Sequence, residues 1–137
     1  MTPDLSVYVN FDGRARQALT FYESVFGGTL EFEEYSAYGI GEPGEGDKII
    51  YGVLHSPDGF VIRGTDKARH DGPVEPGNRY HLCLNGDDAT LLQRCWDRLA
   101  ARSDVIAPQT VTPWGDRNGV LRDEFGITWI VNIGSSS

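Results

Sequence analysis

Apolar and polar residues alternate over 7–11 (VYVNF), which is the pattern of a strand with one buried face. Tyr8 and Asn10 lie on the face opposite the three apolar residues. In the following stretch, 14–26, apolar residues recur every three or four positions, as they do on one face of a helix. We therefore predict a strand followed by an amphipathic helix, with Asp12 as the helix cap.

The same order begins again at 79–85 (RYHLCLN), where apolar residues alternate with His81 and Cys83. We expect Cys83 to be a small buried hydrophobic residue, because no general base lies next to it in the sequence. A second amphipathic helix follows, capped by Asp87 or Asp88. Its apolar face is formed by Leu92, Trp96 and Leu99.

Two stretches of similar sequence, 51–65 and 118–132, each read as a strand, a tight turn and a second strand. The triplet that starts at Gly52 recurs at Gly119, 67 positions later. A further strand is predicted before each hairpin, at 29–36 and 105–112. Each half therefore reads β-α-β-β-β, and the matching order of elements makes a chance similarity of two hairpins a poor explanation.

We predict one α+β domain of 137 residues that contains two βαβββ modules. The predicted parts are module 1 at about 5–66, a linker at about 67–77, module 2 at about 78–133 and a tail at 134–137.

The composition excludes several classes of function. A net charge of −8 without a basic cluster argues against nucleic acid or a membrane surface as a partner. No apolar run is long enough to span a bilayer, and no signal peptide is visible. The two cysteines have neither redox nor zinc spacing. We therefore expect a cytoplasmic protein.

Five motifs occur along the chain: Val9-Asn-Phe-Asp-Gly13, Ala18-Leu-Thr-Phe-Tyr22, Phe26-Gly-Gly28, Trp114-Gly-Asp-Arg117 and Asp123-Glu-Phe-Gly-Ile-Thr-Trp-Ile-Val-Asn132. In this order they resemble the PhnB-like branch of the vicinal oxygen chelate superfamily, which includes glyoxalase I, bleomycin-resistance proteins and extradiol dioxygenases. The resemblance covers nearly the whole chain. It implies that the two modules form a cup-shaped mixed sheet with the helices outside, and that the protein is a homodimer.

The metal-using relatives have ligands at four positions, which the resemblance carries over to Tyr8, Arg63, His81 and Ile130. A catalytic divalent ion in this fold needs imidazole and carboxylate donors. His81 is a suitable donor, but Tyr8 is a protonated phenol near pH 7 and Arg63 is a permanent cation. Ile130 has no donor atom. We therefore predict no metal site and no cofactor.

The resemblance implies that the face opposite the helices lines the cup. The predicted cavity residues are His81, Arg63, Tyr8, Asn10, Tyr51 and Trp114. The Arg63 guanidinium would favour a ligand with a carboxylate, phosphate or enolate oxygen. Aromatic side chains commonly line small-molecule pockets, although Trp114 could equally pack against the protein.

Two functions remain. The first is a metal-free protein that binds a small anionic or aromatic molecule, as antibiotic-sequestering relatives do. The alternative is an isomerase, lyase or dioxygenase that uses His81 as a general base or a metal at a relocated site. A purely dimeric scaffold is a third interpretation. No catalytic residue is predicted.

Overall fold

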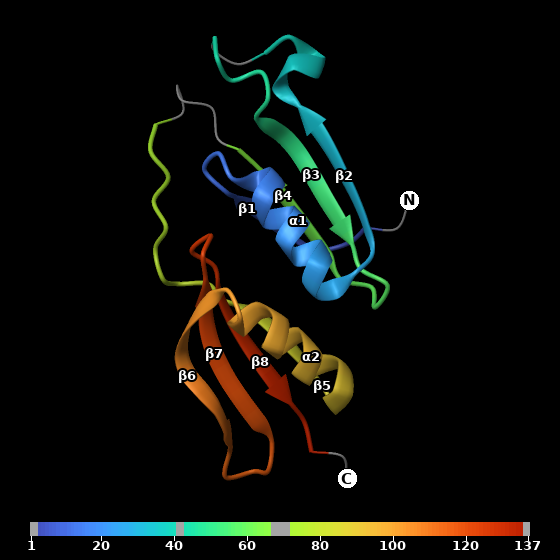
Figure 1. Ribbon diagram of the computed structural model, residues 1–137, viewed down its shortest axis with the longest axis vertical. Coiled ribbons are helices and arrows are strands. Elements are labelled where there is room, and N and C mark those ends of the chain that lie inside the picture. The colour runs from blue at the N-terminus through green and yellow to red at the C-terminus, as the bar shows by residue number, and fades with distance from the viewer. Residues whose placement is uncertain (1–2, 41–42, 67–71, 136–137) are drawn as a thin grey trace. The chain divides into compact units, whose positions relative to one another are not determined.

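A computed structural model describes residues 3–40, 43–66 and 72–135 (Figure 1). The chain divides into two compact units, Met1–Glu75 and Pro76–Ser137. The predicted linker lies partly outside the described residues.

The first unit is a four-stranded sheet with a helix on one face (Figure 1). Its elements are β1 (Val7–Asn10), α1 (Ala15–Phe26), β2 (Thr29–Glu34), the 3-10 helix η1 (Tyr35–Tyr38), β3 (Ile49–His55) and β4 (Val61–Thr65). The strand order is β1-β4-β3-β2, with β1 parallel to β4 and the other pairs antiparallel.

The second unit repeats this arrangement (Figure 1). Its elements are β5 (Leu82–Gly86), α2 (Ala89–Ala100), β6 (Ser103–Val111), β7 (Arg117–Asp123) and β8 (Thr128–Ile133). The strand order is β5-β8-β7-β6, and again only the first pair is parallel. The α+β class and the two βαβββ modules are therefore confirmed, whereas the cup formed by both sheets remains a prediction.

The repeated glycine of the two hairpins lies where each helix packs on its sheet. A Cβ atom added to Gly52 would lie 2.6 Å from Leu19 Cδ1, and one added to Gly119 would lie 2.7 Å from the Trp96 ring. Leu19 and Trp96 are both buried residues of the helix faces that the sequence predicts as apolar. The glycine therefore recurs because the helix approaches the strand too closely for a side chain.

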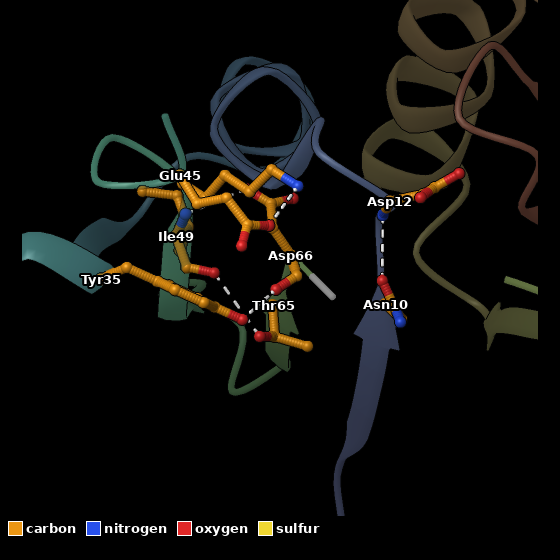
Figure 2. Close-up of polar contacts among 8 residues, drawn as sticks. Asn10, Asp12, Tyr35, Glu45, Ile49, Thr65 and Asp66 are labelled. Atoms are coloured by element: carbon orange, nitrogen blue, oxygen red, sulfur yellow. Dashed lines mark hydrogen bonds and ion pairs between the residues drawn. The ribbon is translucent and has the colours of Figure 1, made fainter. Parts of the chain in front are cut away.

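The start of α1 is held by a carboxylate that lies far away in the sequence. Asp66 is 2% exposed, and its two oxygens accept hydrogen bonds from Ala15 N at 2.9 Å and Ile49 N at 3.0 Å. Its backbone carbonyl accepts a hydrogen bond from the Tyr35 hydroxyl at 2.7 Å (Figure 2). The prediction that Asp12 caps this helix is wrong. The N-cap residue is Arg14, and it makes no side-chain capping hydrogen bond. In α2, by contrast, Asp88 is the cap and accepts from Leu91 N at 3.1 Å.

A local hydrogen-bonding turn closes both hairpins. Asp123 Oδ1 accepts from the backbone N–H groups of Phe125 and Ile127, each at 3.0 Å. Ser56, at the equivalent position of the first hairpin, accepts from two turn N–H groups in the same way. The second oxygen of Asp123 accepts from Trp129 Nε1 at 2.9 Å and fixes this buried indole in the core. The carboxylate of Glu124, the next residue, contacts Arg102.

Candidate functional site

The pairing of β1 with β4 places Tyr8 beside Arg63. The neighbouring residue Gly64 faces α1, since a Cβ atom added there would lie 3.5 Å from Leu19 Cδ1 of that helix. Successive residues of a strand point to opposite faces, so Arg63 and its partner Tyr8 lie on the face that α1 leaves uncovered. The Tyr8 side chain is 55% exposed on this face.

Arg63 is held in place by three residues on two segments of the first unit, β3 and the stretch before β1. Its Nε donates a hydrogen bond to the Tyr51 hydroxyl at 2.9 Å, and one terminal nitrogen donates to Ser6 Oγ. The other terminal nitrogen lies 3.6 Å from the Asp4 carboxylate. The hydrogen bond to Tyr51, with a smaller contribution from Asp4, raises the pKa of Arg63 above its ordinary value. Arg63 is therefore a fixed cation whose side chain is still 23% exposed.

Tyr8, Tyr51 and Arg63 form one patch, which we call the Arg63 face. The rings of Tyr8 and Tyr51 have centroids 6.2 Å apart with an interplanar angle of 51°. The patch combines two phenol rings with a guanidinium group, so it offers apolar contact, hydroxyl groups and positive charge within one surface.

Asn10 lies two residues beyond Tyr8 on the same face of β1 and pairs with Thr65 of β4. Its Oδ1 accepts a hydrogen bond from Asp12 N at 3.0 Å (Figure 2). Asp12 has a positive φ of 53°, so this bond supports the strained turn that leads into α1. Asn10 therefore borders the Arg63 face and also stabilises the turn before α1.

The second unit has a different register from the one that the sequence pattern indicates. Cys83 is the partner of Ile130 in the β5–β8 pair, as Tyr8 is the partner of Arg63 in the β1–β4 pair. The position equivalent to Tyr8 is therefore Cys83, while His81 lies before β5 and is exposed. The expectation that Cys83 is buried is wrong, because its side chain is on the uncovered face of the sheet. A shift of two residues preserves the face of every side chain, so alternation alone cannot detect it.

A ladder of asparagine side chains crosses the second sheet on the face opposite α2. Asn132 Nδ2 donates to Asn85 Oδ1 at 2.9 Å, and its Oδ1 accepts from Asn118 Nδ2 at 3.1 Å. The three residues are also partners in the strand register. The alternation of apolar and polar residues does not reveal this ladder. Asn10 occupies the position in the first unit that Asn85 occupies in the second. This repeated asparagine is the feature of the sequence that could have indicated the ladder.

Trp114 is connected to the end of this ladder through Asp116. The Asp116 carboxylate accepts from Asn132 Nδ2 at 3.1 Å and from Ser135 N at 3.1 Å. The hydrogen bond from Asn132, followed by those from Ser135 and Trp114, lowers the pKa of Asp116. Trp114 itself is 71% exposed in the turn between β6 and β7, so within its unit it does not pack into the core.

Comparison with known proteins assigns the chain to a family. The model of the Glyoxalase/Bleomycin resistance protein/Dioxygenase superfamily matches residues 5–131. The chain belongs to this superfamily. No curated protein matches it significantly.

Several solved structures share the fold of this superfamily member. Protein PA1353 from Pseudomonas aeruginosa is 28% identical over 97% of this chain and 100% of its own, with a TM-score of 0.78. A PhnB protein from Bacillus cereus is 20% identical over 96% and 100% of the two chains, with a TM-score of 0.73. The fosfomycin resistance protein FosX from Mesorhizobium loti is 13% identical over 98% and 95%, with a TM-score of 0.62. None of the described helices is long and apolar enough to cross a membrane.

The donor atoms of this superfamily member do not fit the metal site that its metal-using relatives have. In the first unit the two relevant positions hold the Tyr8 phenol and the Arg63 cation. In the second unit the paired positions hold Cys83 and Ile130, and His81 precedes the strand. Among the residues that the structure describes, no three His, Cys, Asp or Glu side chains are grouped as metal ligands. A guanidinium at a ligand position would repel a divalent ion.

Proposed function

We propose that this member of the superfamily binds a small anionic molecule on the Arg63 face and does not use a metal ion for this. The observation that carries the proposal is the fixed position of Arg63, whose Nε is bonded to the Tyr51 hydroxyl at 2.9 Å while Tyr8 lies beside it. A cation that is already oriented loses little conformational entropy when an anion binds.

The contacts of Arg63 leave room for an incoming oxyanion. Its contact with Asp4 is long, at 3.6 Å, and the Asp4 side chain is 61% exposed. An exposed ion pair of this kind contributes little to stability, so a ligand carboxylate or phosphate can replace Asp4 at small cost. The Tyr51 hydroxyl accepts its hydrogen bond from Arg63, so its own proton is available for a ligand oxygen.

Tyr8 favours a ligand with a planar or apolar body. Its ring is 55% exposed and tilted against the Tyr51 ring. A planar or apolar ligand body would cover this ring while its acidic group reaches Arg63, as in small-molecule sites that combine aromatic walls with a few polar groups. The preferred ligand class is therefore a small aromatic or unsaturated acid.

A thermal-shift screen of small aromatic carboxylates tests the proposal. We expect at least one compound to raise the melting temperature of the wild type by about 9 °C at about 100 times its Kd. The shift should disappear in Arg63→Ala and persist in Arg122→Ala, a matched variant of an exposed arginine on β7. Equal shifts in both variants would remove Arg63 from the site.

The enzymatic alternative requires a relocated metal or His81 as a general base. Metal analysis of the purified protein, with melting curves in Mn²⁺, Ni²⁺ and Zn²⁺, addresses the first possibility. Stoichiometric metal with strong stabilisation would contradict the proposed function. A substrate whose turnover falls in His81→Ala, without loss of stability, would support base catalysis instead.

A further inference from the structure

A groove of about 770 Å³ lies entirely within the second unit, on the face of the sheet that carries α2. One side is the exposed flank of α2, and the other is formed by the β6–β7 turn and the residues after β8. The Arg63 face belongs to the first unit and to the opposite side of its own sheet. The groove is therefore a separate feature with its own residues.

The floor of the groove follows from the strand register. Val111, Arg117 and Ile133 are neighbours across β6, β7 and β8, and all three line the groove. Gly119, two residues after Arg117, faces Trp96 of α2. Arg117 therefore points to the same side of the sheet as the helix. The floor combines two aliphatic side chains with one guanidinium group.

The helical wall supplies two more cations. Arg94 and Arg98 line the groove from α2 and are four residues apart, so they lie one helical turn from each other on the same flank. Arg94 and Arg117 form no ion pair with any residue in the described ranges. Two guanidinium groups from different elements thus line the groove without an ion-pair partner in the described ranges.

The charge of the groove is opposite to that of the chain. The chain has 12 basic and 20 acidic residues. In the groove, three arginines are accompanied by one acidic residue, Asp97. The Asp97 carboxylate accepts a hydrogen bond from Gln93 Nε2 at 3.0 Å. This local reversal of sign attracts anions to a surface that belongs to an acidic protein.

An amide pair joins α2 to β6. Gln93 of α2 donates to Gln109 of β6 at 2.8 Å, and Gln109 donates back at 3.1 Å. This reciprocal pair joins the helix to the edge strand, so the backbone elements that carry the groove residues are held together.

We propose that this groove binds a small molecule that carries two or more phosphate or carboxylate groups. Guanidinium groups bind both kinds of oxyanion in bidentate geometry, and three of them match a ligand with more than one anionic group. A long polyanion is disfavoured by the net charge of −8 on the rest of the protein. The ligand class is therefore a compact polyanion of metabolite size.

Titration of the ¹⁵N-labelled protein with inorganic pyrophosphate, and separately with citrate, tests this proposal. The buffer should contain no phosphate and about 150 mM NaCl, so that weak surface attraction is screened. We expect saturable shifts of the Gly115 and Gly134 amides, which border the groove. Binding of pyrophosphate alone, citrate alone or both supports the site and identifies which oxyanion it accepts.

Variants assign the binding to the groove. The double substitution Arg94→Ala/Arg117→Ala should raise the Kd about tenfold or more, because it removes two charge-assisted contacts. Arg79→Ala is the matched control for an exposed arginine elsewhere, and it should leave the Kd unchanged. Arg63→Ala should also leave it unchanged, which separates this site from the Arg63 face.

The proposal would be overturned by the absence of a saturable shift at these amides up to about 10 mM of either probe, by an unchanged Kd in the double variant, or by an equal loss in Arg79→Ala. Binding that is lost only in Arg63→Ala would reject the groove and support the proposed function. If the groove amides do not shift while a ligand still binds at Arg63, the groove proposal is rejected and the proposed function stands.

Discussion

Asp116 is a half-buried turn residue whose charge stabilises the folded state. Hydrogen bonds from Asn132, Ser135 and Trp114 lower its pKa below the ordinary value of 3.8. Because the folded-state pKa is depressed, this stabilisation is complete above the unfolded value and is lost as the pH falls through the lower folded value. The charge of Asp116 therefore contributes to stability at neutral pH and ceases to do so in acid.

Asp116→Asn tests this pH dependence. The substitution should reduce the free energy of unfolding at about pH 6, and the difference from the wild type should shrink as the pH falls below about 3.8. Urea unfolding at a series of pH values measures it. A constant difference for Asp116→Asn would refute the role assigned to its hydrogen bonds.

At the scale of residues, part of the candidate site follows from alternation. Tyr8 and Asn10 share a face because every second residue of a strand points the same way, and the structure places Arg63 beside Tyr8. The contacts that fix Arg63 involve Ser6 and Asp4, which precede β1. Such contacts depend on the tertiary path of the chain, and no local pattern reports them. The same holds for Asp66, which lies 51 residues from the helix start that it binds.

The repeated glycines give the clearest prediction at the scale of elements. In Gly119→Ala the new methyl group would lie 2.7 and 2.9 Å from atoms of the Trp96 ring. A rigid indole in a packed core cannot move away cheaply, so we expect a loss of about 1–3 kcal/mol in the free energy of unfolding.

Gly86→Ala is a control within the same sheet. A Cβ atom there would meet only Leu92 Cδ1 at 3.5 Å, which is an ordinary contact. We expect a change below about 1 kcal/mol, measured by urea unfolding of both variants. If Gly119→Ala is no more destabilised than Gly86→Ala, close helix–sheet packing does not explain the repeated glycine.

The order of the elements was predictable, but several of their ends were not. Helical and strand periodicity identify both helices and both hairpins because each has one buried face. The predicted strand at 29–36 ends early in the structure, where Tyr35 begins a 3-10 turn and places its hydroxyl on the Asp66 carbonyl. The predicted strand at 79–85 starts three residues late, at Leu82. In both cases tertiary contacts and strand pairing, rather than the local pattern, determine the boundary.

At the scale of the molecule, the resemblance to the superfamily implies a homodimer. We expect light scattering coupled to size-exclusion chromatography to give twice the mass of one chain, and to do so at several protein concentrations because a biological interface buries enough surface to persist on dilution. A monomer mass at every concentration would contradict this expectation.

The net charge of −8 should keep either species from retention on an immobilised polyanion.

The central claim is that the Arg63 face binds a small anion without a metal ion. Titration of the ¹⁵N-labelled protein with an aromatic carboxylate from the thermal-shift screen, in the presence of EDTA, tests it most directly. We predict saturable shifts of the Tyr8, Tyr51 and Arg63 amides, unchanged by EDTA and absent in Arg63→Ala. Binding that disappears with EDTA, or that leaves these three amides unaffected, would contradict the claim.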